Sequence, residues 1–317
     1  MFFETAGIHV AFWVPPLVAF IISFFTSMGG VSGAFLLLPF QVSFLGYVNP
    51  SVSATNQLFN IVAIPSGVYR YCKERRMVWP LTWIVVFGTL PGVLIGAFVR
   101  ITYLPDPRDF KLFAAAVLLY IGTRMVRDLL QKKGGSDKAT SEKRFQNLVR
   151  EFSRHKQSSD NSDPALPYIQ VTHYSRKRLG YKFYGQEFEV SFWGILSLSF
   201  VVGIAGGIYG IGGGAIIAPL FVTFFKLPVY TVAGAALMGT FVTSLAGVAF
   251  YQILAPFYPH LSVAPDWLLG SLFGIGGMAG MYLGARFQKF VPAGAIKWML
   301  AGIIMFTAIK YVAAFLD

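Results

Sequence analysis

The stretch Tyr209-Gly210-Ile211-Gly212-Gly213-Gly214-Ala215-Ile216-Ile217-Ala218-Pro219 lies inside a long apolar segment of this 317-residue chain. Glycine clusters and proline both weaken helices, so the stretch predicts a helix break. At membrane depth, a break is tolerated only where protein or water satisfies the freed backbone groups. We therefore expect a broken helix that faces a cavity inside a membrane protein.

A second copy of this stretch occurs earlier in the chain, at Gly29-Gly30-Val31-Ser32-Gly33-Ala34-Phe35-Leu36-Leu37-Leu38-Pro39. At a constant offset of 180, residues 30–71 align with residues 210–251 without a gap. After the next loop the offset is 188, and it aligns two stripes of glycine, namely Gly88, Gly92 and Gly96 with Gly276, Gly280 and Gly284. Paired breaks in two halves are the sequence feature that best indicates a transporter's binding site, so we infer an internal duplication.

The composition is that of a membrane protein. Hydrophobic residues make up 55% of the chain, charged residues only 13%, and the mean hydropathy is +0.60. Soluble domains carry about 25% charged residues. Several apolar runs reach the roughly 17–25 residues that span a bilayer as a helix, and they lack the alternation of barrel strands. We expect an all-α polytopic membrane protein.

The net charge of +12 does not require a nucleic-acid partner, because the basic residues lie mostly between the spans, as the positive-inside bias predicts. The single cysteine, Cys72, excludes an intramolecular disulfide, and the four histidines are scattered, so we expect neither a metal site nor a cofactor. No acidic residue lies in the middle of a predicted span. Protease, lipase and ATPase motifs are absent as well, so the chain is not expected to be an enzyme.

The chain divides into a first membrane repeat at 1–131, a basic insert at 132–190 and a second membrane repeat at 191–317. Each repeat begins with a hairpin of two short or partial spans and continues with three transmembrane helices. Loop 253–266 contains no Lys or Arg, whereas the cluster at 70–76 is basic. Parallel repeats would place that loop in the cytoplasm, whereas inverted repeats place the cluster and the insert in the cytoplasm and the loop outside. The positive-inside rule therefore predicts two inverted repeats.

The insert contains a predicted β element. Residues 168–173 and 181–190 favour strands, with a turn at Tyr184-Gly185-Gln186. We interpret the insert as a spacer that joins the two halves, with a regulatory domain as the alternative.

Two polar stripes follow the breaks. Within 52–71, Ser53, Asn56, Gln57 and Asn60 share one helical face. Within 229–252, the second stripe consists of Thr240, Thr243 and Ser244. Such a stripe can simply bind a neighbouring helix, but an unmatched Asn-Gln-Asn run is costly in hydrocarbon and favours a wet cavity. Helices that restart after the breaks would add N–H donors and the positive ends of their dipoles, whereas tight helix crossing is the alternative role of the glycines. The predicted substrate-binding residues are Gly30, Ser32, Gly33, Thr55, Asn56, Gln57, Asn60, Gly210, Gly212, Gly213, Gly214, Thr240, Thr243 and Ser244.

The two glycine motifs, Gly29-Gly30-x-Ser32-Gly33-x5-Pro39 and Gly210-x-Gly212-Gly213-Gly214-x4-Pro219, resemble those of the sulfite exporter TauE/SafE family of membrane permeases. The segment Ala54-Thr55-Asn56-Gln57-Leu58 is similar to that family's Ala-Thr-Ser-Leu segment. The resemblance covers both membrane halves. It implies a multi-pass transporter of sulfite, sulfoacetate or taurine-derived sulfonates in a bacterial or archaeal inner membrane. The first motif departs from the second, since it has Ser32 where the second has Gly212.

The resulting hypothesis is a secondary transporter that exports a small anion of the sulfonate or sulfite type. The anion would bind between the two breaks and move by alternating access. The expected partners are this substrate and the lipid bilayer, and a homo-oligomer is compatible with the sequence. The alternatives are an anion channel and a non-transporting membrane scaffold or sensor that acts through 132–190.

Overall fold

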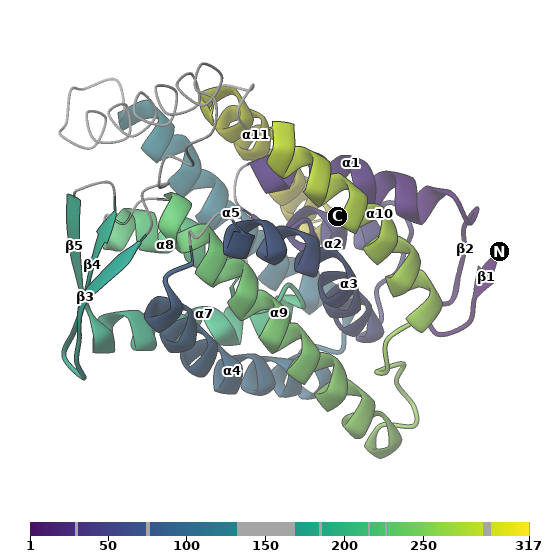
Figure 1. The fold of residues 1–317 in the computed structure, drawn as a ribbon. Coiled ribbons are helices and arrows are strands. Elements are labelled where there is room, and N and C mark those ends of the chain that lie inside the picture. The colour runs from purple at the N-terminus through teal and green to yellow at the C-terminus, as the bar shows by residue number, and fades with distance from the viewer. Residues whose placement is uncertain are drawn as a thin grey trace.

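The computed structural model is a bundle of helices with a small sheet at one end (Figure 1). It describes residues 1–28, 31–73, 77–131, 169–183, 186–214, 216–225, 227, 229–287 and 293–316. Gly29, Gly30 and residues 132–168 of the insert lie outside the described residues.

The first half contains the short strands β1 (Phe2–Phe3) and β2 (Ile8–His9) and the helices α1 (Val14–Met28), α2 (Ala34–Ser43), α3 (Ser51–Lys73), α4 (Trp79–Thr102) and α5 (Pro107–Gln131). The second half contains α7 (Phe192–Tyr209), α8 (Ile217–Phe224), α9 (Val229–Leu254), the 3-10 turn η1 (Ala255–Phe257), α10 (Trp267–Phe287) and α11 (Ala293–Leu316). Among the described residues, four helices are long and apolar enough to cross a membrane, namely those within 79–102, 192–209, 231–257 and 267–284. The expected all-α membrane fold is confirmed.

Both glycine stretches break helices, and each resulting hairpin returns to the side from which it starts. A hydrogen bond of 3.4 Å from Asn49 Nδ2 to Thr5 O joins the segment that follows α2 to the segment that precedes α1. Before α7 and after α8, the hydroxyls of Tyr181 and Thr231 are hydrogen bonded at 2.8 Å. Among the described residues of these hairpins, α7 is long and apolar enough to cross a membrane, whereas α1, α2 and α8 are shorter.

The two glycine stripes pack helices of opposite halves directly against each other. A side chain at Gly92 or Gly96 of α4 would collide with the backbone of α7, at Phe200 O and Ile204 O respectively. In the same way, Gly276, Gly280 and Gly284 of α10 meet the carbonyls of Pro16, Phe20 and Phe24 in α1. Contacts advance in the same direction along both partners, so each pair is parallel. The predicted packing role of the stripes is confirmed.

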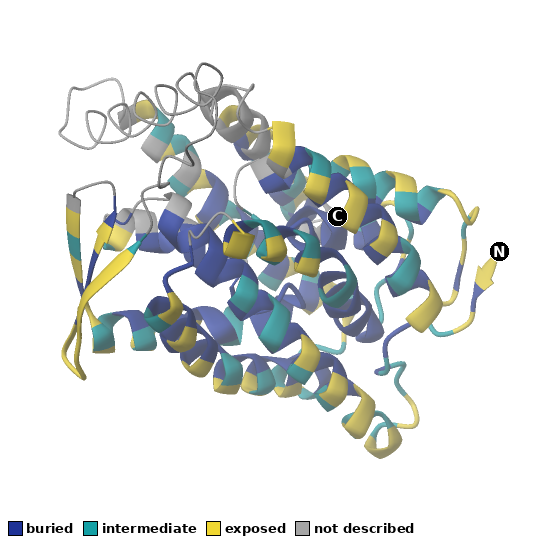
Figure 2. Ribbon diagram, in the orientation of Figure 1, coloured by how far each residue is buried: buried dark blue, intermediate teal, exposed yellow. Residues whose placement is uncertain are grey.

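Helices α3 and α9 are antiparallel and lie in the middle of the bundle, where buried residues gather (Figure 2). The amide of Gln57 lies against Gly247, and Tyr71, further along α3, lies against Gly234. Since α3 follows the first hairpin and α9 follows the second, this pairing brings the two broken hairpins together.

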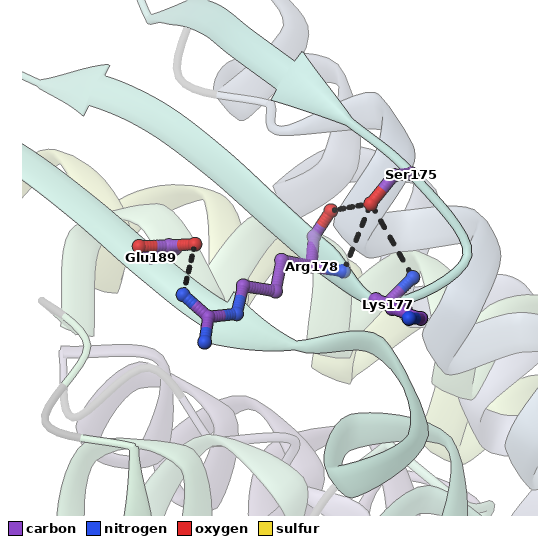
Figure 3. A network of polar contacts seen from close by, with 4 residues as sticks. All are labelled: Ser175, Lys177, Arg178 and Glu189. Carbon is purple, nitrogen blue, oxygen red and sulfur yellow. Dashed lines mark hydrogen bonds and ion pairs between the residues drawn. The ribbon is translucent and has the colours of Figure 1, made fainter.

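The insert ends in an antiparallel sheet of β3 (Gln170–Tyr174), β4 (Arg178–Phe183) and β5 (Gln186–Ser191). Figure 3 shows its β3–β4 turn, where Ser175 Oγ accepts hydrogen bonds from the backbone N–H groups of Lys177 and Arg178. The side chain of Arg178 reaches across to Glu189 at 3.1 Å.

The sheet confirms the predicted β element, with one difference in its strands. The pattern predicted a strand over 181–190 with a turn at 184–186, whereas β4 begins at Arg178 and β5 ends at Ser191. Residues 184 and 185 lie outside the described residues. Tyr181 docks the sheet on α9 through Thr231, and burial raises the pKa of its phenol, which stays neutral.

Gly280→Leu should destabilise the protein, because the new side chain would meet the Phe20 carbonyl of α1. Overpacking of this kind costs typically about 1–3 kcal/mol, so the thermal midpoint of the detergent-purified protein should fall. Gly302→Leu is the matched control, since a side chain at Gly302 meets nothing within 4 Å. Equal midpoints for the two variants would contradict the assigned α1–α10 contact.

Candidate functional site at the crossing of the two helix breaks

The second break reaches the centre of the bundle as bare backbone. Helix α7 ends at Tyr209 and is capped by Gly210, which has φ +77°; Gly212 has φ +75°, and both values favour glycine. A side chain at Gly214 would collide with Ala236 O of α9. The break therefore turns sharply and lies directly on α9, and its carbonyls need partners from neighbouring side chains.

Asn56 supplies one of these partners from α3. Its Nδ2 donates to Gly210 O at 2.9 Å and to Ala34 O at 3.1 Å, while its Oδ1 accepts from Gln41 Nε2 at 3.2 Å. One buried amide thus joins α2 of the first hairpin to the break of the second.

Asn60 lies on the same face of α3 and connects the two breaks. Its Nδ2 donates to Ile211 O at 2.9 Å and to Ser244 Oγ at 3.3 Å. Its Oδ1 accepts from Ser32 Oγ at 2.7 Å, and Ser32 belongs to the first break. Ser32 Oγ also accepts from Ala34 N at 3.3 Å, which satisfies an N–H at the start of α2.

Helix α9 contacts the second break through Thr243. Gly213 N donates to Thr243 Oγ1 at 3.2 Å, and that hydroxyl donates back to Gly239 O at 2.8 Å. The hydroxyl of Thr240 instead bonds to Ala236 O of its own helix, at 2.9 Å. Within the polar stripe on α9, Thr243 therefore accepts a hydrogen bond from the break, whereas Thr240 donates only to the backbone of its own helix among the described residues.

The structure brings together Ser32, Asn56, Asn60, Gly210, Gly212, Gly213, Gly214, Thr240, Thr243 and Ser244 of the predicted site. Thr55 lies apart, because its hydroxyl accepts from Asp266 N at 2.9 Å and bonds to Tyr47 at 2.8 Å. Gly33 packs on Ser23 and Phe59. Gly30 lies outside the described residues.

Gln57 of α3 is buried against α9, and its side-chain amide has no hydrogen-bond partner among the described residues. Sequence reasoning missed Gln41, which donates to Asn56. The signal for it was a lone amide in the apolar segment that follows Pro39.

We call the place where Ser32, Asn56, Asn60 and residues 210–214 meet the crossing, and it is closed in this conformation. Asn56, Asn60, Thr243 and Ser244 are fully buried, and the amide donors of the two asparagines are used by carbonyls of the breaks. The expected wet cavity is therefore not open here, because the freed carbonyls satisfy the amides directly. What the arrangement offers chemically is a set of hydrogen-bond donors that the two hairpins share, with α2 and α8 both starting at the crossing.

These features define a polytopic helical membrane protein in which two hairpins of broken helices meet at their tips, an arrangement typical of secondary transporters. The family model described as "Sulfite exporter TauE/SafE" matches residues 16–311, and the chain belongs to this family of multi-pass plasma-membrane transporters.

Two curated relatives from Bacillus subtilis (strain 168) are both named as probable membrane transporter proteins. The chain is 22% identical to YunE over 287 residues, which cover 88% of this chain and 89% of that protein. It is 28% identical to YdhB over 115 residues, which cover 36% of this chain and only 44% of that protein. No solved structure shows a significant match.

Asn60→Ala should destabilise the closed conformation, because it leaves Ile211 O and Ser32 Oγ without their partner. An unsatisfied buried group costs about 1–3 kcal/mol, which thermal unfolding in detergent would detect. Ser66→Ala is the control on the same helix, since Ser66 Oγ donates within α3 and to Met278 O, away from the breaks. An unchanged midpoint for Asn60→Ala would show that the bridge between the breaks contributes nothing.

Proposed function

We propose that this protein is a secondary transporter of a small sulfur-containing oxyanion of the sulfite or sulfonate type, and that the anion binds where the two helix breaks cross. The observation that carries the proposal is Asn60, whose one amide bonds to Ser32 of the first break and to Ile211 of the second. Paired breaks at the middle of a duplicated membrane fold are where such transporters bind their substrates.

The crossing has donors suited to an anion. Helix α2 starts at Ala34 and α8 starts at Ile217, so the positive ends of both helix dipoles point to the crossing. When the tips separate, the Nδ2 groups of Asn56 and Asn60 and the N–H of Gly213 would lose their present acceptors. Oxygens of the substrate would then replace the break carbonyls and the Thr243 hydroxyl as acceptors. Opening of these hydrogen bonds and binding of the substrate are therefore coupled.

Alternating access requires units that move as rigid bodies. The parallel pairs α4–α7 and α1–α10 are packed backbone to backbone through their glycine stripes, which supports treating each pair as one such unit. Rocking of one pair against the other would open the crossing to one side at a time. The full burial of the crossing side chains favours this mechanism over a channel, which needs a continuous wet pore.

The same pairings support inverted repeats. Under the repeat alignment, α1 corresponds to α7 and α4 to α10, so the α4–α7 pair corresponds to the α10–α1 pair. A two-fold axis in the membrane plane would relate these pairs. Together with the Lys/Arg distribution, this supports a cytoplasmic β3–β5 sheet and a loop 253–266 that faces outside.

Cysteine-accessibility labelling in intact cells tests this orientation in a Cys72→Ser background. A cysteine at His260, in the loop before α10, should react with an impermeant maleimide, whereas one at Lys138 in the insert should react only after permeabilisation. Labelling at position 260 that also needs permeabilisation would contradict the inverted arrangement.

Transport itself is tested with labelled sulfite in proteoliposomes. Wild type should show saturable counterflow without unitary currents. A hydrogen bond to a charged group contributes about 1.5–3 kcal/mol, so Asn56→Ala should lower the apparent affinity roughly 10- to 150-fold. Gly213→Leu should lower it further, because its side chain would enter the space beside Thr89 and the break.

Gly302→Leu serves as the matched control for this second variant, and it should transport like wild type. If Asn56→Ala and Gly213→Leu both keep wild-type affinity for sulfite, the anion does not bind between the breaks. Single-channel currents in wild type would replace the transporter by an anion channel.

A further inference from the structure

A second group of polar side chains lies beside the crossing, and it lacks partners within the protein. Among the described residues, no hydrogen bond is made by Ser53 Oγ, by either amide atom of Gln57, by Tyr251 OH or by Arg100 Nε. All four side chains are fully buried. Buried polar atoms almost always have a partner in native proteins, so four such residues in one place indicate a missing ligand.

These residues are neighbours because α3 and α9 are antiparallel. Gln57 lies against Gly247. Ser53 is one turn earlier on α3 and Tyr251 is one turn later on α9, so the two hydroxyls lie close together. The two hydroxyls nevertheless do not meet hydrogen-bond geometry. Ser53 also lies directly against Gly210, where the second break begins. The group is therefore continuous with the crossing, one turn of α3 away from Asn56 and Asn60.

Arg100 supplies the charge. It lies in the last turn of α4, and its guanidinium carbon is 3.9 Å from the centre of the Phe110 ring. Its Nη1 and Nη2 donate to the carbonyls of Leu104 and Val48, and the next residue of α4, Ile101, belongs to the same buried cluster as Tyr251.

No described carboxylate forms an ion pair with Arg100. The buried carboxylate of Asp266, at the same end of α3, accepts instead from the backbone N–H groups of Leu269 and Ala6. A buried cation without a counter-charge is strongly unfavourable, and a bound anion would remove that penalty.

We propose that Arg100, Tyr251, Ser53 and Gln57 form an anion-binding station on the side of the crossing that faces the chain between α2 and α3. This assignment rests on the proposed function, because it takes the transported oxyanion as the ligand. The station offers one cationic N–H, two hydroxyls and an amide NH₂, which match a compact anion with several acceptor oxygens. A lipid headgroup does not reach it, since the four side chains are fully buried.

The station and the crossing would act in sequence. Gln57 follows Asn56 directly in α3, and Ser53 contacts Gly210, whose carbonyl is held by Asn56. An anion at Arg100 therefore lies next to the hydrogen bond that closes the break. Transfer of the anion to Asn56 would require the Asn56–Gly210 hydrogen bond to open. Opening of the crossing would therefore depend on whether an anion occupies the station.

The test is thermal unfolding of the full-length protein in chloride-free detergent buffer, with fresh sulfite titrated under argon. Wild type should be stabilised by sulfite. Arg100→Met should keep or raise the midpoint without sulfite, because it removes an unpaired buried cation, and it should lose the sulfite-dependent stabilisation. A purely structural arginine would instead lower the midpoint and leave the response to sulfite intact.

Arg124→Met is the matched control, because Arg124 also places its guanidinium over a ring, 4.4 Å from the centre of Phe224, but on α5 away from the station. It should respond to sulfite like wild type. Tyr251→Phe removes only a hydroxyl and should raise the dissociation constant for sulfite about tenfold or more, whereas Tyr311→Phe in α11 should not change it.

The outcomes separate the two proposals. Wild type that neither binds nor transports sulfite would overturn the proposed function and the station with it. Wild type that transports sulfite, with wild-type binding by both Arg100→Met and Tyr251→Phe, would overturn the station alone. Equal stabilisation by chloride and by sulfite would also overturn it, because the donor set would then not distinguish an oxyanion.

Discussion

The structure depends on the satisfaction of backbone carbonyls at two helix breaks that lie away from water. Burying an amide group without a hydrogen-bond partner costs about 2–7 kcal/mol of free energy, and this cost applies to an unpaired carbonyl at such depth. Asn56 and Asn60 meet this requirement from one face of α3, by donating to Gly210 O and Ile211 O. The hydroxyls of Thr240 and Thr243 on α9 donate within their own helix instead, to Ala236 O and Gly239 O.

The glycine stripes make a different contribution. They allow α4 to lie on α7 and α10 to lie on α1 at backbone contact, so each half of the chain is built partly on the other. The dispersion gained from such close packing replaces the hydrophobic effect, which does not drive helices together inside lipid. The broken tips are thus held by a few hydrogen bonds between two tightly packed pairs, a combination that suits a site which must open and close.

Sequence reasoning predicted the fold well where the information is local. Composition and run length indicated the helices, the glycine spacing indicated the packing stripes, and the i, i+3, i+4, i+7 pattern placed Asn56 and Asn60 on one face. It was less successful for the site. Thr55 is adjacent in sequence but bonds to Asp266 and Tyr47, and no sequence pattern identified Arg100 as part of a site.

The sequence by itself determined a helical membrane protein with two broken hairpins and a polar stripe beside each break, because hydropathy, glycine content and helical period act over a few turns. Only the tertiary structure decided which donors are used. Asn56 bonds to Gly210 across 154 positions of sequence, and Gln57, its immediate neighbour, bonds to nothing among the described residues. A helix turns 100° per residue, so neighbouring side chains face different partners, and those partners are fixed by how distant helices pack.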